Sequence, residues 1–104
     1  MDADINRLLL RFEQLMRETN REIINPEIQV LNVEGLKPIV EVVARARAAY
    51  LKRLCEIAQE HDQGVPSDEE VAELEQLGRR FQALAEGSQA IEAAIQRGYL
   101  DIQE

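Results

Sequence analysis

Apolar residues in the first part of the chain recur at the spacing of one helix face. Between residues 3 and 24 they fall at i, i+3, i+4 and i+7, which is the pattern of an amphipathic helix. This stripe consists of Ile5, Leu8, Leu9, Phe12, Leu15, Met16, Thr19 and Ile23. Leu10 and Ile24 lie off the stripe. Asn25-Pro26 predicts the end of the helix, because the residue before a proline is displaced from the α region.

The segment over residues 25–36 allows two interpretations. Its central part, residues 28–33, has the β-branched and apolar composition of a strand. A lone strand in a helical chain needs a pairing partner from elsewhere, however. We therefore favour a short turn or an extended linker that packs inward, and a paired strand is the alternative. Gly35 and Pro38 mark the end of this segment.

The helix predicted over residues 37–61 is apolar on two sides. Its main stripe consists of Ile39, Val42, Val43, Ala46, Ala49, Tyr50, Leu54 and Ile57. A second stripe consists of Ala44, Ala48, Leu51 and Cys55. At about 100° per residue, Cys55 lies about 160° from Ile39 around the helix. A helix that is apolar over most of its circumference is buried on several sides, so we expect it to be central in the monomer or to lie at a dimer seam.

The clearest local signal in the chain precedes the third helix. Ser67 and Glu70 form an S-x-x-E capping box, which predicts a helix over residues 68–97. Its heptad positions, continued into the tail, are held by Leu74, Leu77, Phe81, Leu84, Ser88, Ile91, Ile95, Gly98 and Ile102. Because this phase continues past Gly87, we predict one long helix. The alternative is a break near residue 87, with Ser88 as the cap of a fourth helix.

The chain ends in an apolar tail. Gly98, directly after Arg97, predicts the end of the third helix. Three large apolar residues follow this stop, and they are Tyr99, Leu100 and Ile102. Such a tail either folds back onto the body of the protein or meets a partner.

Together these elements predict an all-α fold. The chain of 104 residues is 45% hydrophobic and 31% charged, which is the composition of a globular protein with room for one domain. We predict a single helical domain over residues 1–104. It is an antiparallel bundle of three to four helices, and it is dimeric.

Net charge and cysteine content narrow the class of protein. The formal net charge is −8, and residues 62–104 carry ten acidic and three basic side chains. Because generic nucleic-acid binding depends on basic residues that neutralise phosphates, we expect no nucleic-acid partner.

The single Cys55 excludes an internal disulfide. No segment approaches the length of a membrane span, about 18 apolar residues, and the N-terminus lacks the apolar core of a signal peptide. We therefore expect a cytoplasmic protein without membrane association.

Candidate catalytic and metal-binding residues do not form a motif. His61 is the only histidine and has Glu56, Glu60 and Asp62 nearby, but the Glu-x-x-His motif of di-iron bundles is absent. Cys55 belongs to the second apolar stripe, which indicates a packing thiol and not a nucleophile. We predict no catalytic residue, no cofactor and no metal site.

Arginines provide the best case for an enzyme. Arg47 and Arg53 flank the main apolar stripe of the second helix. The first helix carries Arg7, Arg11, Arg17 and Arg21. Arginines from several helices can clamp a carboxylate bidentately, so a small helical enzyme with an arginine-lined pocket is one alternative. The other interpretation is that Arg47 and Arg53 cover apolar surface with their stems or pair with glutamates of a neighbouring helix.

The surplus of apolar stripe favours association with another protein chain. We predict a small acidic protein–protein interaction or adaptor protein that forms a homodimer. The predicted interface consists of Ala44, Ala48, Leu51, Cys55, Tyr99, Leu100 and Ile102. One alternative is a chaperone-like or structural subunit whose apolar stripe a different protein covers. Another is a self-contained bundle whose alanine stripe faces water.

Overall fold

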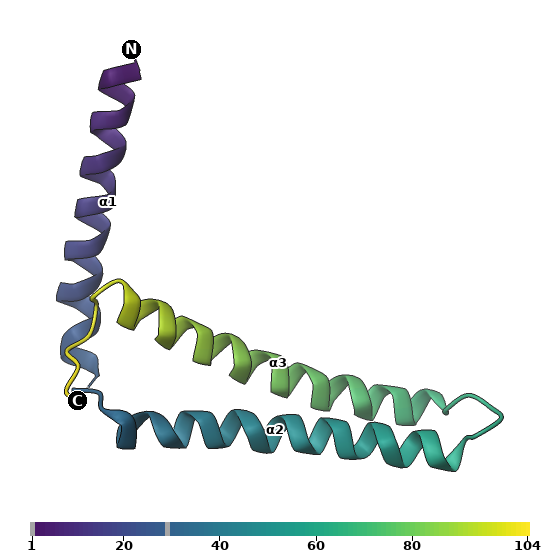
Figure 1. The fold of residues 1–104 in the computed structure, drawn as a ribbon. Helices are drawn as coiled ribbons and strands as arrows, with labels where there is room; N and C mark the ends of the chain where they lie inside the picture. The colour runs from purple at the N-terminus through teal and green to yellow at the C-terminus, as the bar shows by residue number, and fades with distance from the viewer. Residues whose placement is uncertain (1, 29) are drawn as a thin grey trace. The chain divides into compact units, whose positions relative to one another are not determined.

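Helices make up the ordered elements of the computed structural model, which describes residues 2–28 and 30–104. In chain order they are α1 (Asp2–Ile24), the short 3-10 helix η1 (Asn25–Glu27), α2 (Val33–Glu60) and α3 (Asp68–Gln96) (Figure 1). No strand forms within the described residues, so the all-α prediction is confirmed. The prediction of one continuous third helix is also confirmed, because α3 runs through Gly87 without a break.

The start of α2 differs from the sequence pattern. The helix begins at Val33 and not near residue 37. Asn32 caps it, since its Oδ1 accepts a hydrogen bond of 2.8 Å from the backbone N–H of Gly35. This cap satisfies a donor that the first turn of a helix otherwise leaves without a partner. Pro38 therefore lies inside the helix, where it removes one backbone hydrogen bond.

The chain divides into two compact units, which we describe separately. One unit combines the N-terminal residues up to Leu36 with Ile91–Glu104, and the other consists of Lys37–Ala90. We call the first the terminal unit and the second the hairpin.

The hairpin pairs α2 with α3 in antiparallel orientation (Figure 1). Ile57 is its most deeply buried described residue, with 2% of its surface exposed. Half-buried positions recur every three or four residues on both helices, which is the spacing of a coiled-coil seam. On α2 they include Ile39, Val43, Ala46, Tyr50 and Arg53, and on α3 they include Glu70, Leu74, Leu77, Phe81, Ala85 and Ser88.

This seam is narrower than the predicted main stripe of the second helix. Val42, Ala49 and Leu54 belong to that stripe but are exposed in the hairpin. Two paired helices cover a narrower strip of each other than the helices of a larger bundle do. Apolar residues on the flank of the seam therefore remain accessible.

In the terminal unit, α3 ends in a Schellman motif. Gly98 has a φ of +76°, a left-handed conformation that glycine adopts without the strain a Cβ would cause. The backbone N–H of Tyr99 donates to the carbonyl of Ala94 at 2.9 Å, and that of Gly98 donates to Ile95 at 3.2 Å. These two hydrogen bonds define the motif, and they confirm the predicted helix stop.

The tail after this stop folds back along the chain. The backbone N–H of Leu31 donates to the carbonyl of Asp101 at 3.0 Å, and the N–H of Gln103 donates to the carbonyl of Leu31 at 2.8 Å. Leu31 and Ile102 thus form an isolated parallel bridge. Leu100 becomes buried, with 4% of its surface exposed.

This bridge also resolves the interpretation of residues 25–36, apart from Gln29, which lies outside the described residues. In the described part of this segment, the 3-10 helix η1 is followed by one bridged residue, Leu31. The prediction of a turn or linker is therefore closer to the structure than the prediction of a paired strand. In the part of the chain that the structure describes, no helix combines the length and apolar content needed to cross a membrane.

Candidate interaction surface

The apolar stripe of α1 is uncovered within the terminal unit. Every described residue of α1 before Asn20 is exposed. Leu8 has 70% of its surface accessible, and Ile23, near the other end of the stripe, has 65%. A contiguous apolar face of this kind marks an interaction site more often than an isolated exposed leucine does. We call this surface the α1 face, and it consists of the predicted stripe of α1, namely Ile5, Leu8, Leu9, Phe12, Leu15, Met16, Thr19 and Ile23.

The charged contacts between the tail and α1 lie on the side opposite the α1 face. At about 100° per residue, Arg21 lies about 180° from the centre of the stripe. Its guanidinium donates to the carbonyl of Gly98 at 3.0 Å and to a carboxylate oxygen of Asp101. These contacts hold the pKa of Asp101 below its usual value, chiefly through the hydrogen bond from Arg21. The tail therefore anchors the end of α1 and leaves the α1 face free.

Charged residues are arranged asymmetrically around α1. By the same helical geometry, Asp4, Glu13 and Glu22 lie within about 100° of the centre of the α1 face. Arg7 and Arg17 lie at about 140° from it, on the back of the helix with Arg21. Arg11 is the one base close to the stripe. The α1 face is thus bordered mainly by carboxylates.

The interface residues predicted from the sequence fall into two groups. All four members of the second α2 stripe are exposed, including Cys55. In the tail, Ile102 is exposed, Tyr99 is half-buried and Leu100 is buried inside the terminal unit. A hydrogen bond with Asn20 is the main cause of the lowered pKa of the Tyr99 hydroxyl. Tyr99 and Leu100 thus already have partners within their own unit.

A second apolar surface lies beside the hairpin seam. It is a hollow of about 330 Å³ between α2 and α3, and we call it the α2–α3 groove. Its lining residues are Val42, Arg45, Ala46, Ala49, Leu77, Arg80 and Leu84. Arg45 pairs with Glu41 at 2.9 Å, one turn away on the same helix. Arg80 has no ion-pair partner among the described residues. The sequence pattern did not indicate this groove, because its walls come from two helices that only the pairing brings together.

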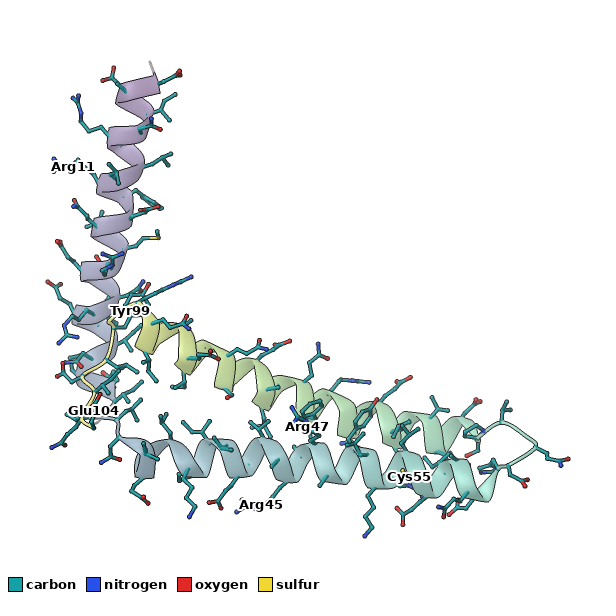
Figure 2. The ribbon with its side chains drawn as sticks, in the orientation of Figure 1. Arg11, Arg45, Arg47, Cys55, Tyr99 and Glu104 are labelled. Carbon is teal, nitrogen blue, oxygen red and sulfur yellow. The ribbon has the colours of Figure 1, made fainter. Side chains whose placement is uncertain are left out.

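Aromatic side chains pack across the hairpin. The rings of Tyr50 and Phe81 stack with centroids 6.3 Å apart, and the guanidinium carbon of Arg47 lies 5.0 Å from the centroid of Phe81. Figure 2 shows Arg47 directed toward α3. Gly78 permits the close approach of Tyr50, because a Cβ at this position would lie 3.2 Å from its Cε1 atom. The charge of Arg47 is therefore held against an aromatic face.

Arg53 is paired with glutamates, as one of the two sequence interpretations expects. Its Nε donates to Glu73 at 2.8 Å, and its terminal nitrogens lie 3.9 Å from oxygens of Glu60 and Glu70. The hydrogen bond to Glu73 is the main cause of its raised pKa. A guanidinium that already faces three carboxylates is poorly placed to clamp an acidic substrate, so Arg53 does not serve as a residue of the arginine-lined pocket.

Polar side chains converge where α2 ends and α3 begins. Glu70 Oε1 accepts a hydrogen bond of 2.9 Å from the backbone N–H of Ser67, while the N–H of Glu70 donates to Ser67 Oγ at 3.1 Å. The predicted capping box is therefore confirmed. His61 Nε2 lies 2.8 Å from the same Glu70 oxygen.

These contacts favour the ionised form of Glu70. Its pKa is lowered, first by the backbone hydrogen bond from Ser67 and also by the proximity of His61. The stabilisation that the carboxylate provides is present above pH 4.5, its ordinary pKa, and is lost as the pH falls through the lowered pKa.

Ligand atoms of Glu60, His61 and Glu70 lie within 4.8 Å of one another and are the residues that could hold a metal ion. The sequence analysis missed Glu70 as a neighbour of His61, although the capping box fixes its position at the start of α3. Two features weaken the case for a metal. His61 and Glu70 already satisfy each other, and the Arg53 guanidinium lies beside both carboxylates. The cluster is accounted for as an ion-pair network that joins the two helices.

The capping box gives a direct prediction. Ser67→Ala removes the hydroxyl that accepts from the N–H of Glu70, so we expect the free energy of unfolding to fall by about 1 kcal/mol. Urea unfolding followed by circular dichroism measures this change. Ser67→Asp keeps a cap acceptor and serves as the control. A Ser67→Ala protein as stable as the wild type would show that the cap contributes nothing.

Comparisons of this chain with family models, with curated proteins and with solved structures find no match.

Proposed function

We propose that this protein is a small protein–protein interaction protein that associates with a second copy of itself through the α1 face. One observation carries the proposal, namely that the stripe of α1 is exposed along its length within its own unit. A folded protein gains little by keeping such a stripe in water.

The magnitudes support self-association. Burial of one leucine, isoleucine, phenylalanine or methionine side chain contributes about 1.5–3 kcal/mol. The large apolar side chains of the stripe are Ile5, Leu8, Leu9, Phe12, Leu15, Met16 and Ile23. Association costs on the order of 4–15 kcal/mol in lost freedom of motion. Burial of most of these side chains in each copy therefore suffices for a stable homodimer.

The remaining features are compatible with this function. The single cysteine requires no oxidising compartment, and we propose that the protein acts in the cytoplasm. The second α2 stripe, centred on Ala48, stays a predicted seam. Its exposed members are small apart from Leu51, so it offers less apolar surface than the α1 face.

Two neighbouring leucines provide a matched test. Leu9 lies on the stripe, whereas Leu10 lies on the back of α1, and the two are 54% and 61% exposed. By sedimentation equilibrium at micromolar concentration we expect a wild-type dimer. Leu9→Asn should weaken it by about tenfold or more, because the leucine is lost from both copies. Leu10→Asn should leave the dissociation constant within about threefold.

Other outcomes would contradict the proposal in distinguishable ways. A wild-type chain that remains monomeric at tens of micromolar would exclude self-association. A dimer that Ala48→Glu disrupts and Leu9→Asn does not would move the seam to the second α2 stripe. Circular dichroism of each variant shows whether the helices are retained.

A further inference from the structure

The α2–α3 groove and the α1 face have complementary properties. The groove has an apolar floor, to which Ala46, Ala49 and Leu77 contribute, and two arginines line it. The α1 face is apolar and is bordered mainly by carboxylates. Two helices that pair along one side present a groove into which the ridge of a third helix fits.

Charge favours this pairing over contact between two copies of α1. Two α1 faces brought together would place acidic borders against acidic borders. In the groove, the same carboxylates would approach Arg80, which has no ion-pair partner among the described residues, and Arg45, which faces only Glu41. Opposite charges at the rim of an interface steer association and set its register.

We propose that the α2–α3 groove binds the α1 face of a second copy of this chain, with Arg45 and Arg80 facing the carboxylates that border that face. In the symmetric dimer each copy gives its α1 to the groove of the other, so the contact is made twice. This inference rests on the proposed self-association and names the surface that receives α1.

Adjacent alanines on α2 separate the groove from the outer face of the helix. Ala49 lines the groove and Ala48 lies in the second α2 stripe, and both are exposed. Ala49→Glu should raise the dissociation constant of the dimer by about tenfold or more, because it places a carboxylate on the apolar floor in both copies. Ala48→Glu should change it by less than about threefold.

A charge exchange between two variants tests whether α1 and the groove come from different copies. One variant carries Arg45→Glu and Arg80→Glu, and the other carries Glu13→Lys and Glu22→Lys. Each variant by itself should dimerise poorly. If the affinity falls about fivefold for each α1–groove contact, it falls about 25-fold in a dimer in which both symmetric contacts are altered. In the mixture, the altered groove meets the altered α1 and the native groove meets the native α1. Sedimentation equilibrium of the mixture should therefore show a heterodimer close to wild type in affinity.

The failure of this inference differs from the failure of the proposed function. If the wild type dimerises and Leu9→Asn disrupts the dimer, but Ala49→Glu does not, self-association holds and the groove is not its site. If the two charge variants dimerise poorly and their mixture is no better, α1 does not meet the groove of a second copy. If the wild type is monomeric, both proposals fall.

Discussion

Replacement of Ile57 by alanine is expected to lower the free energy of unfolding by about 2 to 5 kcal/mol. Ile57 is 2% exposed and occupies the seam between α2 and α3. Its removal takes apolar atoms out of a packed contact and leaves a cavity that two helices close only in part. Because small domains are stable by about 5–15 kcal/mol, a loss of this size reaches a large fraction of the total. Urea unfolding monitored by circular dichroism measures it.

Val40→Ala is the matched control for Ile57→Ala. Val40 lies on the same helix but is 64% exposed, so its truncation should change stability by less than about 0.5 kcal/mol. Equal losses in the two variants would show that Ile57 is not the centre of a packed seam. Hydrogen exchange of α2 amides adds a local reading, with faster exchange expected around Ile57 in the alanine variant.

Replacement of Leu100 by alanine is expected to have a comparable effect on the terminal unit. Leu100 is 4% exposed, and it directly follows the Schellman turn at Gly98 and Tyr99. We expect a loss of about 2 to 5 kcal/mol in the stability of this unit. The amides of Leu31 and Gln103, which hold the tail in place, should exchange with solvent much faster.

Ile102→Ala supplies the control within the same tail. Ile102 is 52% exposed, so its truncation should leave the exchange of these two amides nearly unchanged. If the Leu31 and Gln103 amides exchange at the same rate in the Leu100→Ala variant as in the Ile102→Ala variant, Leu100 does not anchor the tail. In that case the backbone bridge alone would hold it.

The features that local sequence predicts are those whose partners lie within a few residues. The Ser67–Glu70 capping box and the stop at Gly98 were both expected, because each is built from hydrogen bonds between near neighbours. The start of α2 was placed too late, because the β propensity before it obscured Asn32 as a cap.

The features that the sequence does not predict depend on contacts between distant segments. Of the tail residues, Leu100 is buried and Ile102 is not, and this choice follows from the bridge to Leu31 and not from any pattern in the tail. Similarly, no spacing rule places Ala49 and Arg80 on the walls of one groove. Such neighbours are set by the pairing of α2 with α3.

Arg53 links α2 to α3 through a hydrogen bond to Glu73 and ion pairs within the seam. It is the charged residue among the half-buried seam positions named on α2, and its Nε donates a hydrogen bond to Glu73 of α3. If α3 slipped by one heptad in one direction, Arg80 would take the place of Glu73 opposite Arg53. If it slipped by one heptad in the other direction, Pro66 would take that place, and the guanidinium would lose the carboxylate of Glu73. A polar group at a seam position is the device that fixes registry in coiled coils. We therefore expect Arg53 to discriminate against slipped pairings of the two helices, and only the unslipped alignment keeps Ala49, Leu77 and Arg80 on one shared surface.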